Sequence, residues 1–324
     1  MLDSLRFVAA AVAKKDYVQG LTHFKIKDGR VTGFNGEIAL SSDIDVDLDI
    51  YPNAAKLLAA IKACTGTIAL NMTPGGKLSV KSGKFRSLVD CMTDDTAVTY
   101  SEPEGDSVEL NEAFYAGLKA LAPVMGIDAS RPWAMGIKVQ SGSMLATNNV
   151  MLAEYWHGLT LPFDAVIPDI AINELLRIGE APTNVQITDH SISFRWGEKK
   201  WLWSKLIEGG MWPVARVQDI MSTEDGPQLP FPPEFFEAVE TLKPFLLESN
   251  SLYLTSSSIA TSRNDGEGTS IEIDLPVVTE MQSYQQKQLS ILGQVAQTID
   301  WSAYPRPCIF RGTNLRGALV GQKV

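Results

Sequence analysis

"IPDIAINELLRIG", residues 167–179, spaces its small and apolar residues as one face of a helix and places Pro168 at the start. Proline fits the first turn of a helix, where its missing N–H group is not needed. The stretch therefore predicts a helix packed by one face against a core. Two other segments have the same character: "YPNAAKLLAAIKAC", residues 51–64, and "SYQQKQLSILGQVAQ", residues 283–297.

The three segments are evenly spaced. Pro52 and Pro168 are 116 residues apart (168 − 52), and so are Pro168 and Tyr284 (284 − 168). This period is far longer than that of solenoid repeats, so it indicates three copies of a domain. Each copy also has an earlier helix and a hairpin with Gly or Ser at its turn. The earlier helices are 2–15, 110–125 and 232–246, and the hairpins are 23–35, 135–149 and 251–264.

Further strands follow each second helix, so every copy has the order helix, strands, helix, strands. We expect an α+β protein with domains at 1–104, 105–224 and 225–324. Segments rich in acids, Pro and Gly, 93–107 and 218–233, are typical of linkers between such domains.

Composition restricts the classes of protein. The 324 residues carry a net charge of -10, which argues against a protein that coats nucleic acid with its whole surface, although one face can still be basic. No apolar run approaches the roughly 20 residues that span a bilayer. The N-terminal stretch, with acid and base before its apolar run, predicts an amphipathic helix rather than a secretion signal. Three scattered cysteines without a CxxC pair favour a reducing cytoplasm.

No motif predicts catalysis. Asp43, Asp45, Asp47 and Asp49 alternate, which predicts one solvated face of a strand and not a calcium loop. "TPGGK", residues 73–77, lacks the spacing of a phosphate-binding loop and predicts a hairpin turn. The three histidines have no metal-ligand spacing, and no G-x-S-x-G elbow is present. No cofactor is expected.

Tryptophans mark the end of the second copy. Trp201 and Trp203 share one strand face, which favours sheet packing over a ligand cage. The following "SKLIEGGMWP", residues 204–213, ends in a Trp-Pro step that restricts the backbone. We expect a rigid, partly apolar corner of the kind that forms a binding groove.

The same stretch resembles the S-R-L-I-E-G-x-F-P signature of bacterial sliding clamps, the polymerase III beta subunits. "SRPWAMGIKVQSGSMLATNNVMLAEY", from Ser130, is similar to the R-x-x-L-N-G and A-T-D-G-H-R-L-A patterns of that family, and residues 165–180 are similar to its V-I-V-P-R-K helix. The resemblance spans all three copies and is strongest in the middle one. The chain departs from the pattern where Asn148, Asn149, Val150 and Met151 replace D-G-H-R, and its tail lacks the M-P-M-R ending. We interpret the sequence as a divergent, phage-type member.

The resemblance implies a DNA-clamp fold: a processivity ring closed by two chains, trimers not being excluded, with helices lining the hole and sheets outside. Such a ring encircles duplex DNA without sequence preference and tethers a replicative polymerase, without catalysis. Basic residues in or beside the inner helices are the expected contacts with phosphates. They are Lys14, Lys15, Lys56, Lys62, Lys119, Arg131, Arg177, Lys243 and Lys287.

The resemblance also implies a groove beside the Trp-Pro corner that accepts short apolar peptides of the polymerase and the clamp loader. Carried over by position, its residues are Ala134, Thr147, Met151, Leu152, Pro213, Val217, Leu319 and Val320. The expected location is the cytoplasm, of a bacterium or of a phage host. Two other hypotheses stay open: a clamp-like scaffold that docks partners without encircling DNA, and a metal-dependent hydrolase using the Asp-rich strand.

Overall fold

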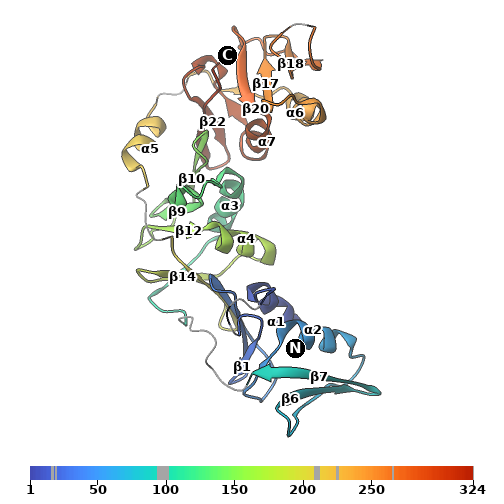
Figure 1. Cartoon of the computed structure of the whole chain (residues 1–324). Helices are drawn as coiled ribbons and strands as arrows, with labels where there is room; N and C mark the ends of the chain where they lie inside the picture. The colour runs from blue at the N-terminus through green and yellow to red at the C-terminus, as the bar shows by residue number, and fades with distance from the viewer. Residues whose placement is uncertain are drawn as a thin grey trace. The chain divides into compact units, whose positions relative to one another are not determined.

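The computed structural model describes residues 1–15, 18, 20–92, 102–207, 212–223, 226–264 and 266–323. The chain forms two compact units. Unit 1 comprises Met1–Asn111 and Ile170–Leu206, and unit 2 comprises Glu112–Asp169 and Ile207–Val324. Helices and antiparallel sheets alternate along both units (Figure 1), so the expected α+β class is confirmed. The division into three repeated domains stays a prediction.

Unit 1 contains a seven-stranded sheet built from two distant parts of the chain. Its order is β1 (Lys25–Lys27), β2 (Arg30–Phe34), β3 (Ile38–Asp43), β15 (Lys200–Lys205), β14 (Ser191–Trp196), β13 (Asn184–Ile187) and β8 (Ser107–Glu109). At the central β3–β15 junction, Trp203 lies opposite Ala39. Trp201 and Trp203 are buried against Ala39 and the partly buried Phe34. The predicted packing role of these tryptophans is confirmed.

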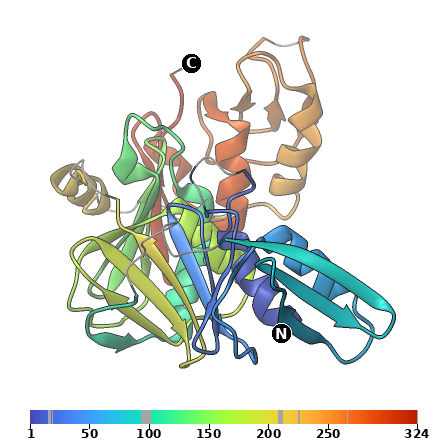
Figure 2. The ribbon, with the colours of Figure 1, turned by 60° about the horizontal axis from the view of Figure 1, so that its bottom comes forward.

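A smaller sheet of unit 1 has the order β4 (Tyr51–Pro52), β7 (Phe85–Met92), β6 (Lys77–Ser82) and β5 (Ala69–Met72). Helices α1 (Leu2–Val8) and α2 (Ala54–Ala63) lie side by side near it (Figure 2). Asn53 caps α2, because its side-chain oxygen accepts a hydrogen bond from the Lys56 backbone N–H. Helix α4 (Asp169–Ile178) buries Ala171, Ile172 and Leu175, as its spacing predicts.

Tight turns join the predicted hairpins. Asp28 and Gly29 both have positive φ, 51° and 69°, as a two-residue hairpin turn requires. In "TPGGK" the Thr73 N–H donates to the Lys77 carbonyl at 2.8 Å, and Gly76 has φ 72°. The hairpin prediction for that segment is confirmed.

Unit 2 contains an eight-stranded sheet, with α3 (Glu112–Leu121) packed on β11. The order is β12 (Ala165–Pro168), β9 (Gly136–Gln140), β10 (Ser143–Thr147), β11 (Met151–Trp156), β23 (Leu315–Leu319), β22 (Cys308–Gly312), β21 (Thr298–Ile299) and β16 (Leu229–Pro230). The β11–β23 junction pairs Met151 with Leu319 and joins two segments far apart in the sequence. This junction positions the site described below.

The last sheet of unit 2 has the order β19 (Ser270–Glu272), β18 (Ser258–Ala260), β17 (Ser251–Leu254) and β20 (Gln282–Gln285). Helices α6 (Phe235–Leu242) and α7 (Gln286–Val295) lie side by side (Figures 1 and 2). Their core is aromatic: Phe235 packs edge to face on Phe236, and Trp301 contacts Phe235 and Tyr284.

Two sequence predictions about unit 1 are wrong in part. The N-terminal helix ends early: α1 and a short 3-10 helix (Ala9–Ala11) are followed by Val12 in an extended conformation, so Lys14 and Lys15 lie beyond the helix. The Asp-rich strand also ends at Asp43, because 44–49 forms no ladder with a neighbour. Its alternation persists without the strand: the four aspartates are exposed, while the intervening Ile44 and Val46 are buried.

A third correction concerns the segment expected to be a linker. Helix α5 (Val214–Met221) extends into residues 218–233. Val217 is buried with Leu145, Leu152 and Trp212, and Ile220 and Met221 pack against this cluster. Of the acidic and Gly-Pro residues that suggested a linker, Asp219 lies within this helix, and Gly226 and Pro227 follow it. Within the described residues, no helix is both long and apolar enough to cross a membrane.

Candidate functional site

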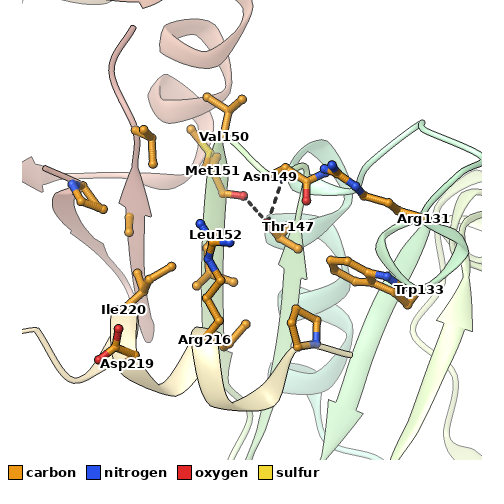
Figure 3. Close-up of a pocket in the computed structure, with 15 residues that line it drawn as sticks. Arg131, Trp133, Thr147, Asn149, Val150, Met151, Leu152, Arg216, Asp219 and Ile220 are labelled. Atoms are coloured by element: carbon orange, nitrogen blue, oxygen red, sulfur yellow. Dashed lines mark hydrogen bonds between the residues drawn. The ribbon is translucent and has the colours of Figure 1, made fainter. Parts of the chain in front are cut away.

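A pocket of about 730 Å³ lies in unit 2 between α5, the ends of β10, β11 and β23, and the short 3-10 helix Pro132–Ala134 (Figure 3). The strands supply its floor, and α5 and the 3-10 helix supply its walls. The lining residues are Arg131, Trp133, Thr147, Asn149, Val150, Met151, Leu152, Pro213, Arg216, Val217, Asp219, Ile220, Pro307, Ala318 and Val320.

The floor is apolar and firmly packed. Met151 and Leu152 are 1% and 5% exposed, so they shape the pocket more than they project into it. The ring of Trp133, in the wall, packs edge to face on the ring of Trp212 behind it, with the centroids 5.4 Å apart. Trp133 is only partly buried and lines the pocket, whereas Trp212 belongs to the buried cluster.

The turn between β10 and β11 is held by side chains. Thr147 Oγ1 donates to the Met151 carbonyl at 2.8 Å and accepts from the Asn149 N–H at 3.1 Å. Asn148 Oδ1 accepts from the N–H groups of Val150 and Met151. Asn149 has φ 72°, a left-handed conformation that Gly and Asn adopt most easily. The departure from the D-G pattern at this turn therefore preserves the local geometry.

Arg316 of β23 fixes α5 against the sheet. Its guanidinium donates to the carbonyls of Met221 and Thr223, at the C-terminal end of the helix. These carbonyls lack partners within a helix, and a cation there also interacts favourably with the helix dipole. At the other end, Pro213 precedes the helix and its carbonyl accepts from the Val217 N–H at 3.0 Å. The α5 wall is thus held to the sheet by Arg316 at its C-terminal end and by Val217, which is buried against Leu145 and Leu152.

Most of the predicted groove residues line this pocket. Thr147, Met151, Leu152, Pro213, Val217 and Val320 do so, while Ala134 and Leu319 are 1% and 0% exposed and lie outside the lining. The sequence prediction missed Trp133, Arg216 and Ile220. The spacing of Val217, Ile220 and Met221 fits one face of a helix, but it does not show that α5 and its Arg216 lie over the sheet. In "SKLIEGGMWP", residues 208–211 lie outside the described residues.

The predicted DNA contacts are exposed on several elements, and some already have partners. Lys56 pairs with Asp90, Arg177 with Glu174, and Lys243 with Glu240 at 3.6 Å, while the Lys119 ammonium lies 4.4 Å from the centre of the Tyr115 ring. Lys14, Lys15, Lys62 and Lys287 are exposed, with no ion pair to another described residue. Arg131, also in this predicted set, lines the pocket.

The ionisable groups with shifted pKa values are not themselves part of the pocket lining, although Asp128, whose pKa is lowered, lies near Arg131. Burial raises the pKa of the Cys308 thiol to about 11; this thiol lies 3.3 Å from the Tyr284 hydroxyl in a closed network that also includes Gln282. Hydrogen bonds from Lys56 and Lys77 lower the pKa of Asp90 to about 2. Over the described ranges, no three His, Cys, Asp or Glu side chains group closely enough to hold a metal ion. The arrangement at the pocket suits binding of an apolar ligand.

Comparison with solved structures gives full-length matches. The sliding clamp (DNA polymerase III subunit beta) of Pseudomonas aeruginosa bound to griselimycin matches with a TM-score of 0.82 and 17% identity, covering 100% of this chain and 97% of that one. The fold is that of the bacterial sliding clamps. The clamp of Caulobacter crescentus matches over the same shares with a TM-score of 0.83 and 16% identity.

A third similar structure is the Helicobacter pylori beta clamp bound to a DNA ligase peptide, with a TM-score of 0.80 and 17% identity over 100% of this chain and 97% of that one. No protein-family model matches the chain, and no curated protein matches it in sequence. The clamp fold expected from the quoted motifs is therefore confirmed by structure at very low sequence identity.

Proposed function

We propose that the chain is a DNA sliding clamp: copies of it close into a ring around duplex DNA and tether a replicative polymerase. The observation that carries the proposal is the clamp fold over the full length of the chain, combined with an apolar pocket containing most of the predicted groove residues. Topological linkage, rather than affinity, would hold the ring on DNA, so the protein needs no basic surface overall.

Ring closure has support in both units. Leu88 on β7 is 48% exposed and shares an outward strand face with Arg86, whose cross-strand partner is Lys81. In unit 2, Phe245 and Leu247 are 53% and 50% exposed and precede the exposed Glu248. Large exposed apolar residues beside charges of opposite sign are suited to a contact between copies. We propose that these two surfaces meet head to tail, in a dimer.

The pocket would receive short apolar peptides from the polymerase and the clamp loader. The structure of the Helicobacter pylori clamp holds a DNA ligase peptide, and that of the Pseudomonas aeruginosa clamp holds griselimycin. Here the apolar floor and the partly buried Trp133 offer a place for one or two large side chains. The basic residues on α2, α3, α4 and α7 would contact phosphates without sequence preference. The site of action would be the cytoplasm.

The test is retention on DNA of different topology. The full chain is loaded by the cognate loader onto a nicked circular plasmid, separated from free protein on a sizing column, and compared with a linearised sample. Retention on the circle and loss from linear ends supports encirclement. A chain that light scattering shows to be monomeric at micromolar concentration, and that leaves both DNAs equally, is a docking scaffold instead.

A further inference from the structure

We propose that Arg316, which is not part of the pocket lining, determines the size of the apolar side chain that the pocket accepts, because it fixes the position of helix α5. The inference rests on the proposed function, since it concerns the apolar anchor of a bound peptide. Arg316 is therefore a positioning residue: it acts on the ligand through the helix that forms one wall of the pocket.

Helix α5 depends on its surroundings for its position. It has eight residues, Val214–Met221, and helices shorter than about 12 residues are marginally stable on their own in water. Its N-cap residue is Pro213, whose side chain has no polar group that could cap the helix. Val217 is buried, and Ile220 and Met221 pack against the same cluster. A short helix held by one narrow apolar face can slide or tilt unless a directional contact fixes it.

Arg316 makes such a directional contact. Its guanidinium donates to the carbonyl oxygens of both Met221 and Thr223. The hydroxyl groups of Ser222 and Thr223 donate to the Asp219 carbonyl and stay within the end of the helix, whereas the bonds from Arg316 connect this end to β23. A planar guanidinium holds two acceptors in a fixed geometry, and its charge strengthens both hydrogen bonds. The end of α5 is therefore fixed relative to the sheet in both distance and direction.

This contact lies beside the pocket. Arg316 and Ala318 are two residues apart on β23, so they share a face of the sheet, and Ala318 lines the pocket. On α5, the pocket-lining residues Asp219 and Ile220 immediately precede Met221. Figure 3 shows Ile220 on α5, beside the strands that form the floor. Because Arg316 fixes the Met221 carbonyl, it also fixes where the Ile220 side chain lies over the floor.

The opposite wall is also fixed. Trp133 lines the pocket from the 3-10 helix Pro132–Ala134, and its ring packs edge to face on Trp212. The Ala134 carbonyl accepts a hydrogen bond from the Gly126 N–H at 2.8 Å, which ties this short helix to the preceding chain. With both walls fixed, the pocket has a set width. A rigid apolar pocket discriminates between side chains by size, because one methylene too few or too many changes binding by roughly tenfold or more.

The experiment uses labelled octapeptides that differ only at one anchor position, occupied by Ala, Leu, Phe or Trp. Dissociation constants are measured by fluorescence anisotropy with the full chain. We expect the parent to prefer its best anchor over the next by about tenfold, and Arg316→Gln to reduce this preference to about twofold. Arg316→Lys should fall between them, because an ammonium group does not reproduce the planar fork. Arg263→Gln, an exposed arginine outside the pocket lining, is the matched control and should keep the full preference.

Hydrogen exchange followed by mass spectrometry distinguishes a local effect on α5 from a general loss of stability. In Arg316→Gln, the amides of residues 214–223 should exchange about tenfold faster, while those of β10 and β11 keep the rate of the parent. Faster exchange throughout unit 2 would show that Arg316 stabilises the fold as a whole, and would overturn the positioning role.

The binding outcomes separate this inference from the proposed function. A size preference that is unchanged in Arg316→Gln overturns the inference. An equal loss of affinity for all four anchors also overturns it, because Arg316 would then support binding without setting the size. Failure of the parent to bind any of the peptides overturns the peptide-binding part of the proposed function as well. If Arg316→Gln does not fold, Arg316→Lys keeps the charge and carries the same test.

Discussion

Asn148 Nδ2 donates a hydrogen bond to Oε1 of Gln288, 3.1 Å away, and so ties the turn between β10 and β11 to helix α7. Gln288 is 6% exposed, so this contact is shielded from solvent. The other end of the Asn148 side chain accepts from two backbone N–H groups of the turn. One side chain thus fixes both the shape of the pocket edge and its attachment to the neighbouring helix.

We expect Asn148→Ala to lower the free energy of unfolding by about 1–3 kcal/mol, because it leaves buried or half-buried polar groups without partners. Asn148→Asp keeps the acceptor for the turn and should cost less, since the Gln288 amide can turn to donate. Urea denaturation of both variants checks this order. Asn149→Gly is the control: at φ 72° Gly is readily accommodated, so its effect should stay within about 1 kcal/mol. Equal losses for Ala and Asp would contradict the assigned role.

Trp133 should dominate peptide binding. It is the one partly buried tryptophan of the pocket lining among the described residues, and aromatic side chains carry much of the energy of such contacts. Trp133→Ala should weaken the affinity for a short labelled peptide that contains a Leu-Phe pair by about tenfold or more. Trp133→Phe should weaken it by less. Anisotropy titrations measure both.

The control for that experiment is Trp156→Ala, at the far end of β11 and 42% exposed. It should leave the peptide affinity unchanged. Met151→Asp is a poorer probe than the sequence suggests, because this side chain is 1% exposed and a buried carboxylate would disturb the sheet as well. If Trp156→Ala loses as much peptide affinity as Trp133→Ala, the pocket assignment is wrong.

Much of the fold was predictable, because the helix and hairpin signals are local. Asn53, Pro168 and the Asp28–Gly29 turn each fix a boundary within a few residues of chain. The junctions β3–β15 and β11–β23 were not predictable from periodicity, since they pair segments more than 150 residues apart. Helix α5 was missed because its apolar face spans only two turns beside an acidic stretch.

The site was predictable by position and not by chemistry. Thr147 and Val320 line the pocket, as the family pattern predicted from their positions in the sequence. Trp133, Arg216 and Ile220 required the structure, because their relevance depends on how α5 lies over the sheet. Ala134 and Leu319 follow the pattern too, yet both are buried outside the lining, since burial depends on the side chains packed around them.

His157 should make unit 2 less stable as the pH falls. It is 3% exposed, and burial lowers its pKa below the ordinary value. Its Nδ1 accepts from the Leu159 N–H at 3.0 Å, while Nε2 lies 3.2 Å from the Gln140 carbonyl. A second proton at Nδ1 would face a donor, so the folded state disfavours the charged ring.

The unfolded chain binds a proton near pH 6.5, before the folded chain does. The contribution of His157 is therefore fully present above that pH and is lost as the pH falls below it, by at most about 1.4 kcal/mol per pH unit. Urea midpoints between pH 7.5 and 5 measure this, and His157→Gln should reduce the slope. An unchanged slope in the variant would show that other groups govern it.

Lys62 and Lys287 should contact DNA. Both are exposed, on α2 and α7, and neither forms an ion pair within the part of the chain that the structure describes. Reversal of either to Glu should weaken binding to duplex DNA and reduce the slope of log affinity against log salt by about one. Lys199→Glu, exposed between β14 and β15, is the control and should change neither. Indistinguishable slopes would mean that these lysines are only solvated.

Phe245 should be required for the contact between copies. Its 53% exposed ring is suited to pack against Leu88 of a second copy, with Glu248 near Arg86. Phe245→Asp places a charge in that apolar contact and should shift the proposed dimer toward monomers by about tenfold or more in dissociation constant. Leu88→Asp should do the same from the other side. Light scattering across a dilution series measures the mass of each variant.

Ile127→Asp is the matched control for the two interface variants, because Ile127 is 82% exposed and lies outside both proposed surfaces. It should leave the mass unchanged. Raised salt should weaken the proposed dimer of the parent as well, because the flanking charges are solvent-exposed and are screened within about 10 Å at 0.1 M. A Phe245→Asp protein that stays dimeric while Leu88→Asp dissociates would place the partner of Leu88 elsewhere in unit 2. If both variants stay dimeric, the proposed ring contact is wrong.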